Sequence, residues 1–366
     1  MHSSLVLRLT LCLALIFCVG VDRAKAQENF KFRADVHTGL VLPEYSQMLY
    51  LVNAPVVGAE FSLCRLAKPT KYWNQLYRFP EYGFTFQFTS LGNQQVLGYE
   101  YAVFPYFTLP LVRKQSFLFY QQYGFGVGYA TKKFDLTTNY QNVAVGSHFN
   151  AHFSFKLGVK WNLDQRTALN GGLFFTHYSN ANMAEPNLGL NFAGVYAGIQ
   201  IGRTNATPSP TLEVPAHVKK NEFAVVTAFG GKHTRALQSD IYQAASITFE
   251  YKRHVYHKVH VGGGLDFSYD SSTQPEMAAK GKYNFKPIDN YRSGIHVAQE
   301  FVYAQFSFIL QEGVYIGLTD KVNNHPIYTK AVVRYKVNAH WLLHFAMRSH
   351  LHILDYPEIA IGYRIE

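Results

Sequence analysis

The sequence predicts an all-β fold, an antiparallel transmembrane β-barrel of about sixteen strands. Strand-like segments of about 9 to 14 residues recur along the chain, many with alternating apolar and polar residues. Aromatic and charged residues each make up 16% of the chain, whereas ordinary soluble domains are about 25% charged. After residue 26, no apolar run reaches the ~18 residues that a transmembrane helix needs. Strands must therefore cross the membrane, and a soluble β-sandwich fits less well.

Residues 1–26 have the pattern of a secretory signal peptide. Arg8 supplies the positive charge, an apolar segment too short to span a bilayer follows, and Ala24 and Ala26 mark a small-x-small cleavage site. The mature chain then keeps a single cysteine, Cys64. We expect an exported protein without internal disulfide bonds.

The first half of the mature chain, residues 27–203, contains eight predicted strands. They centre on residues 30–42, 56–66, 82–91, 99–112, 116–130, 148–163, 169–180 and 191–203. A membrane-spanning strand needs about 9 to 11 residues, and bacterial barrels have even strand numbers. These segments meet both requirements.

Residues 204–221 contain several prolines without any period, which predicts an extended linker. Residues 222–366 form the second half, with eight further predicted strands. These centre on residues 221–234, 242–255, 257–270, 293–305, 306–318, 327–337, 340–351 and 358–365.

The sixteen strands can close as one wide barrel or as two tandem barrels of eight strands. The long linker favours two, because periplasmic turns are normally short, whereas the usual pattern of one barrel per chain favours one. We expect one wide barrel. With the N-terminus in the periplasm, the connection 181–190 lies outside the cell and the linker lies in the periplasm.

One stretch of the first half, residues 171–202, indicates a chemistry. The strand period of two sends His177 and Ser179 to one apolar face, and the next predicted strand places Asn191 on a matching face. Two interpretations remain open. The three side chains form either a small hydrogen-bond cluster near a strand end or a nucleophilic triad in which Ser179 attacks an acyl carbonyl.

The sequence HYSNA, followed by PNLG, resembles the signature of the lipid A 3-O-deacylases, which are outer-membrane barrels that remove an ester-linked acyl chain from lipopolysaccharide. The likeness is dense over residues 172–202 and only architectural over the rest of the first half. It implies that Ser179 is the nucleophile and His177 the general base. It also implies that the backbone N–H groups of Asn180 and Ala181 bind the oxyanion.

The chain departs from that family at the third triad position, where the family has a glutamate and this chain has Asn191. An amide oxygen can accept the imidazole N–H but carries no charge. The same spacing with an asparagine is similar to the triad of the outer-membrane phospholipases A. We therefore expect Asn191 to orient His177, with lipid A or a phospholipid as the substrate.

The resemblance to the phospholipases also allows a calcium ion, but Glu185 is the only acid in residues 171–202. Glu185 is an alternative triad acid if its loop folds back, although its polar turn favours a solvated position. Residues 171–202 therefore do not supply the set of carboxylates that a calcium site needs.

Two other sequence patterns could indicate a binding site. His350 and His352, with Asp355 and Glu358, form a histidine cluster, which fits a polar loop edge better than a metal site. The glycine run in residues 262–266 fits close packing better than phosphate binding.

The two halves resemble each other loosely, which suggests a degenerate duplication. His350 aligns with His177 within one residue of slippage, and His352 falls where the first half has Ser179. We expect the second half to be catalytically silent.

Together these patterns predict an exported outer-membrane esterase that acts on lipid A or lipopolysaccharide, with no cofactor and no nucleic-acid partner. The alternatives are a phospholipase A and a non-catalytic porin or scaffold with a decayed triad. The formal net charge of +10 suits an anionic membrane surface, although diffuse charge also aids solubility. The oligomeric state is left open.

Overall fold

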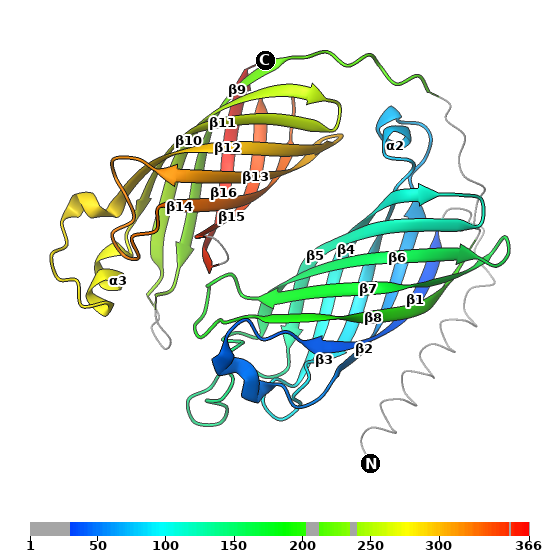
Figure 1. The fold of residues 1–366 in the computed structure, drawn as a ribbon, viewed down its shortest axis with the longest axis horizontal. Coiled ribbons are helices and arrows are strands. Elements are labelled where there is room, and N and C mark those ends of the chain that lie inside the picture. The colour runs from blue at the N-terminus through cyan, green and yellow to red at the C-terminus, as the bar shows by residue number, and fades with distance from the viewer. Residues whose placement is uncertain (1–29, 203–211, 235–239, 351–352, 366) are drawn as a thin grey trace.

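The computed structural model describes residues 30–202, 212–234, 240–350 and 353–365, which fold into two closed antiparallel barrels of eight strands each (Figure 1). The last strand of each half pairs with the first strand of the same half. The expectation of one wide barrel is therefore wrong. Each half satisfies its own edge strands, so neither barrel has an open edge to offer the other. The predicted signal peptide lies outside the described residues.

The first barrel matches the predicted segments to within two residues at every strand end. Its strands are β1 (Lys31–Val41), β2 (Val56–Leu66), β3 (Glu81–Ser90), β4 (Tyr99–Arg113), β5 (Phe117–Ala130), β6 (Phe149–Asn162), β7 (Thr167–Ser179) and β8 (Leu190–Ile201). A short 3-10 helix, η2 (Ser46–Leu51), follows β1, and a short helix, α2 (Tyr72–Leu76), connects β2 to β3.

The second barrel contains β9 (Asn221–Lys232), β10 (Tyr242–Tyr256), β11 (Val259–Asp270), β12 (Tyr291–Tyr303), β13 (Phe306–Tyr315), β14 (Ile327–Lys336), β15 (Trp341–His350) and β16 (Ile353–Ile365). The largest difference from prediction is that β16 begins before Pro357, which we expected to precede the strand. Pro357 lies opposite Met347, beside a register shift at Arg348 and Ser349. A proline, which lacks an N–H donor, is tolerated at such an irregularity.

The connection between β11 and β12 carries α3 (Thr273–Ala279) and the 3-10 helix η3 (Pro287–Asn290). Within the described ranges, every helix is too short or too polar to cross a bilayer.

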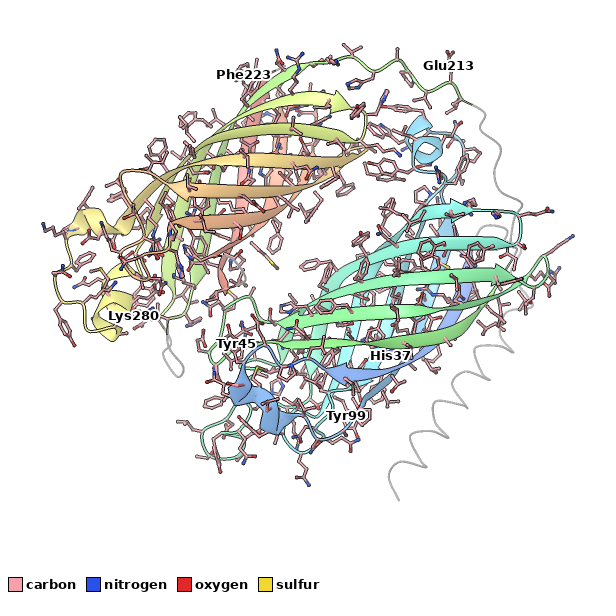
Figure 2. The ribbon with its side chains drawn as sticks, in the orientation of Figure 1. His37, Tyr45, Tyr99, Glu213, Phe223 and Lys280 are labelled. Atoms are coloured by element: carbon pink, nitrogen blue, oxygen red, sulfur yellow. The ribbon has the colours of Figure 1, made fainter. Side chains whose placement is uncertain are left out.

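Both barrels turn apolar side chains outward and polar ones inward. In β9, Phe223 is 57% exposed (Figure 2), whereas Glu222, which directly precedes it, is fully buried. Phe229, on the same face as Phe223, is 66% exposed. In β7, Leu173 is 57% exposed on the outer wall and Asn170 is buried inside. An apolar exterior around a polar interior is the pattern of a barrel embedded in lipid.

Ion pairs fill the interior of the first barrel. Lys156 is completely buried, and its Nζ lies 3.0 Å from Asp35 Oδ2 and 2.7 Å from Glu60 Oε2. The same ammonium lies 4.2 Å from the centre of the Tyr196 ring. The interior of the second barrel holds a similar network around Lys252, whose Nζ lies 2.9 Å from a carboxylate oxygen of Glu300. These side chains make the interiors packed cores.

Replacing Lys156 with methionine is expected to lower the free energy of unfolding by about 3 to 5 kcal/mol, because two buried carboxylates then lose their cation. The measurement is the urea midpoint of folding in detergent micelles. The matched control is Lys133→Met, which makes the same change at an exposed loop position. Equal midpoints for the two variants would contradict the account of the barrel interior.

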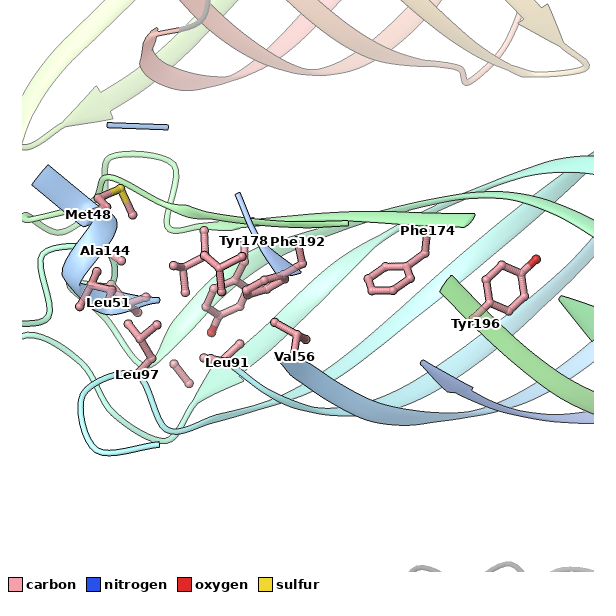
Figure 3. Close-up of a cluster of buried hydrophobic side chains, with 14 residues drawn as sticks. Met48, Leu51, Val56, Leu91, Leu97, Ala144, Phe174, Tyr178, Phe192 and Tyr196 are labelled. Atoms are coloured by element: carbon pink, nitrogen blue, oxygen red, sulfur yellow. The ribbon is translucent and has the colours of Figure 1, made fainter. Parts of the chain in front are cut away.

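An apolar cluster closes one end of the first barrel (Figure 3). Met48 and Leu51 of η2 pack there with Tyr178 of β7 and with Leu190 and Phe192 of β8. The cluster therefore joins a loop helix to the two strands that carry the HYSNA motif, and it fixes which face of each strand points inward.

Candidate active site

The candidate triad lies on the outer wall of the first barrel, where β7 and β8 pair. His177 lies directly opposite Asn191, and on the other side Ser179 lies opposite Ala151 of β6. Their neighbours in the alternation, Tyr178 and Leu190, are buried in the apolar cluster with 0% and 1% exposure. Since strand neighbours point to opposite faces, the cluster holds the three polar side chains on the lipid-facing side.

The three side chains form one continuous chain of hydrogen bonds. The oxygen Oδ1 of Asn191 lies 2.8 Å from His177 Nδ1, and His177 Nε2 lies 3.0 Å from Ser179 Oγ. An amide oxygen only accepts, so Nδ1 carries the imidazole proton. The free lone pair of Nε2 then accepts a hydrogen bond from the Ser179 hydroxyl. This is the arrangement that an activated serine nucleophile requires.

The site is shielded but borders the apolar wall. Ser179 is 8% exposed, while His177 and Asn191 are half-buried. Leu173 and Val195 lie on the same outer face of β7 and β8, with exposures of 57% and 53%. Exposed apolar side chains of the outer wall therefore share a strand face with the serine.

The loop after Ser179 folds around its own asparagines. Asn180 Oδ1 accepts hydrogen bonds from the backbone N–H groups of Met183 and Ala184, and Asn180 Nδ2 donates to the carbonyl of Ala184. Ala181 and Asn182 have φ angles of +55° and +65°. The left-handed conformation costs a residue other than glycine about 1 to 2 kcal/mol, so other contacts must hold this turn.

The two predicted oxyanion donors differ in this structure. The N–H of Asn180 donates to Asn187 Oδ1 over 3.0 Å and so is already engaged. The N–H of Ala181 has no hydrogen-bond acceptor among the described residues, although Ala181 is only 8% exposed. A backbone donor that is not engaged, next to Ser179, suits a developing oxyanion.

Sequence reasoning missed Asn187 and Gly189, although both belong to the PNLG half of the motif. Gly189 has a φ of +71°, and a Cβ there would lie 3.4 Å from both His177 Cε1 and Ser179 Cβ. The glycine therefore lets the loop close tightly over the triad. A glycine directly before a predicted strand is the sequence signal that could have indicated a turn with positive φ at this position.

Glu185 is not the solvated residue that its polar turn predicted. It is half-buried, and burial raises the pKa of its carboxyl group. Asn191 occupies the Nδ1 side of His177, so the position of the triad acid is already filled.

The loop does not fit a calcium ion. Such an ion takes about 6 to 8 oxygen ligands, and Glu185 is the only carboxylate in this connection. The side-chain oxygens of Asn180 and Asn187 are both engaged in hydrogen bonds with the backbone. In the part of the chain that the structure describes, no group of three or more histidine, cysteine or acidic side chains is placed to hold a metal.

The other candidate sites have structural roles. His350 is buried inside the second barrel and bonds to Tyr315, whereas His177 lies on the outer face of the first barrel. His352 lies outside the described residues. Glu358 pairs with Lys330 over 3.2 Å. In the glycine run, a Cβ on Gly264 would lie 2.8 Å from the His296 ring, which confirms close packing.

Comparison with known families identifies both barrels. A model of the lipid A 3-O-deacylase family (PagL) matches residues 64–200, and a model of the acyloxyacyl hydrolase C-terminal domain matches residues 221–366. No curated protein matches the chain.

Solved structures also match. Neisserial surface protein A is 10% identical and has a TM-score of 0.32, covering 47% of this chain and 96% of its own. The outer-membrane enzyme PagL is 17% identical and has a TM-score of 0.31, covering 46% of this chain and 98% of its own. With its two halves matched by the two models, the chain belongs to the PagL-like lipid A 3-O-deacylase family of outer-membrane β-barrel proteins.

Proposed function

We propose that this protein removes an ester-linked acyl chain from lipid A of lipopolysaccharide. The observation that carries the proposal is the hydrogen-bonded series Ser179, His177 and Asn191 on a lipid-facing wall. Family membership supports the substrate. The basic chain, with a formal net charge of +10, also suits an anionic lipid surface.

The reaction proceeds in two steps. Ser179 Oγ attacks the ester carbonyl carbon while its proton passes to His177 Nε2, and the carbonyl oxygen becomes an oxyanion that the Ala181 N–H stabilises. The bond from the carbonyl carbon to the sugar oxygen then breaks, and His177 returns the proton to that oxygen. Water next attacks the carbonyl carbon of the acyl-serine while its proton passes to His177 Nε2. The bond from that carbon to Ser179 Oγ then breaks, His177 returns the proton to Oγ, and the free fatty acid leaves.

Asn191 acts through His177. Its amide oxygen holds the Nδ1–H tautomer, so that Nε2 faces the serine. It supplies no negative charge to the imidazolium, and orientation is its contribution. The proposed steps use only groups of this chain.

A phospholipase A would use the same triad on a different lipid, and the asparagine is the observation that favours it. The test offers purified protein either lipopolysaccharide or phospholipid vesicles, and mass spectrometry identifies the products. Release of a hydroxy fatty acid from lipopolysaccharide is expected. Lysophospholipid as the sole product would move the assignment to a phospholipase, and no product from a folded protein would overturn the esterase assignment.

A further inference from the structure

The loop that follows the nucleophile contacts the second barrel. Asn182 Nδ2 donates to the carbonyl of Asp355 over 3.2 Å and to the carbonyl of His233 over 3.5 Å. In return, the N–H of His233 donates to the carbonyl of Asn182 over 3.2 Å. Asp355 belongs to β16 and His233 directly follows β9, so one loop residue bonds to a strand of the other barrel and to the residue that follows the neighbouring strand.

The segments that accept hydrogen bonds from Asn182 are held in place by a buried ion-pair cluster. Lys232, the residue before His233, is 3% exposed, and its ammonium contacts the carboxylate of Asp355. The same ammonium lies 3.2 Å from Asp270 and 2.9 Å from Glu276 of α3. This buried cluster joins the ends of β9, β11 and β16, which makes it a rigid anchor for the loop.

The two halves of the loop bond to different barrels. Leu188 and Gly189, in the second half, donate to the carbonyls of Val143 and Ala144 in the first barrel. Asn182 lies in the turn with positive φ angles, and its hydrogen bonds to another part of the chain go to the second barrel. Because a left-handed turn of two residues other than glycine is strained, the cross-barrel bonds oppose its relaxation.

We infer that the second barrel is a positioning module for the catalytic loop, and that Asn182 is its positioning residue. By holding the turn, Asn182 keeps the neighbouring Ala181 N–H in place for the oxyanion. This inference rests on the proposed function. It gives the second barrel, which the sequence predicts to be catalytically silent, a role in the reaction of the first barrel.

The two barrels also contact each other at the end remote from the catalytic loop, and this second contact provides a control. Tyr303, the last residue of β12, donates its hydroxyl to Asn74 Oδ1 over 2.7 Å, and its ring packs on Tyr77 at 5.1 Å between centroids. Figure 1 shows the two barrels side by side, with α2 at the end remote from the loop between β7 and β8. Tyr303→Phe removes one cross-barrel hydrogen bond and leaves the catalytic loop untouched.

The experiment measures kcat and KM for ester hydrolysis with Asn182→Gly, Asn182→Asp and Tyr303→Phe. Glycine keeps the left-handed turn but loses both side-chain bonds, and we expect kcat to fall by about 10-fold. Aspartate has a similar shape but presents carboxylate oxygens to two carbonyls, and we expect a fall of about 10²-fold, comparable to the loss of an oxyanion donor. KM is expected to stay unchanged in both, because an oxyanion donor acts on the transition state.

Tyr303→Phe is expected to match the wild type in kcat and KM. All variants are first checked for heat-modifiable migration, which reports a folded barrel. Wild-type kcat in a folded Asn182→Asp variant would overturn the inference. If Ser179→Ala also keeps full activity, the proposed function itself has failed; if Ser179→Ala is inactive, only the role of Asn182 has.

Discussion

Replacing Ser179 with alanine is expected to lower the rate of lipid ester hydrolysis by about 10⁶-fold, the loss seen when a triad serine is removed. Ser179 is at the end of the hydrogen-bonded series, and its hydroxyl donates to His177 Nε2 over 3.0 Å. Without it no acyl-enzyme forms. A residual rate above that of water remains, because the oxyanion donor and the lipid-binding wall are still present. The measurement is fatty acid release from lipopolysaccharide micelles under single-turnover conditions.

The Ser179→Ala variant is expected to fold normally. The side chain lies on the outer wall, whereas the residues that hold β7 in register, such as Tyr178, point into the apolar cluster. Heat-modifiable migration and the urea midpoint should therefore equal those of the wild type. A folded variant with undiminished hydrolysis would show that Ser179 is not the nucleophile.

Replacing Asn191 with alanine is expected to lower kcat by up to about 10⁴-fold, because His177 then loses the acceptor that fixes its tautomer. Replacing Asn191 with aspartate is expected to keep or raise kcat. A carboxylate at the same place also accepts the Nδ1–H, and it adds a charge that stabilises the imidazolium. The two variants separate orientation, which an asparagine supplies, from charge, which it does not.

The measurement for both Asn191 variants is kcat on lipopolysaccharide, with a chemical probe of the serine as a second readout. A fluorophosphonate labels an activated serine, and labelling of Ser179 should follow the same order as kcat. Equal kcat and equal labelling in the alanine variant and the wild type would contradict an orienting role for Asn191.

Much of the fold could be predicted because barrel strands carry a local signal. The period of two, the aromatic residues and the turn residues placed the strands of the first barrel to within two residues. Closure could not be predicted in the same way. Whether β8 pairs with β1 or with β9 depends on contacts between distant segments, and the alternation is the same in either case.

In the candidate site, too, the local features could be predicted and the contacts between distant segments could not. The spacing of His177, Ser179 and Asn191 is local to one hairpin, so strand geometry alone brings them together. The partners of Asn180 and Asn182 depend on how the loop folds and on what the second barrel presents, and sequence reasoning missed them. The alignment of His350 with His177 allowed one residue of slippage, and a slip of one residue moves a side chain to the other face of its strand, so the alignment could not predict that His350 lies inside its barrel.

The most direct test of the proposed function is mass spectrometry of lipid A from cells that express either the wild-type protein or Ser179→Ala, with phospholipids analysed from the same extract. The account predicts that lipid A loses the mass of one hydroxyacyl chain only when Ser179 is present. Unchanged lipid A in cells that contain the folded wild-type barrel would contradict it.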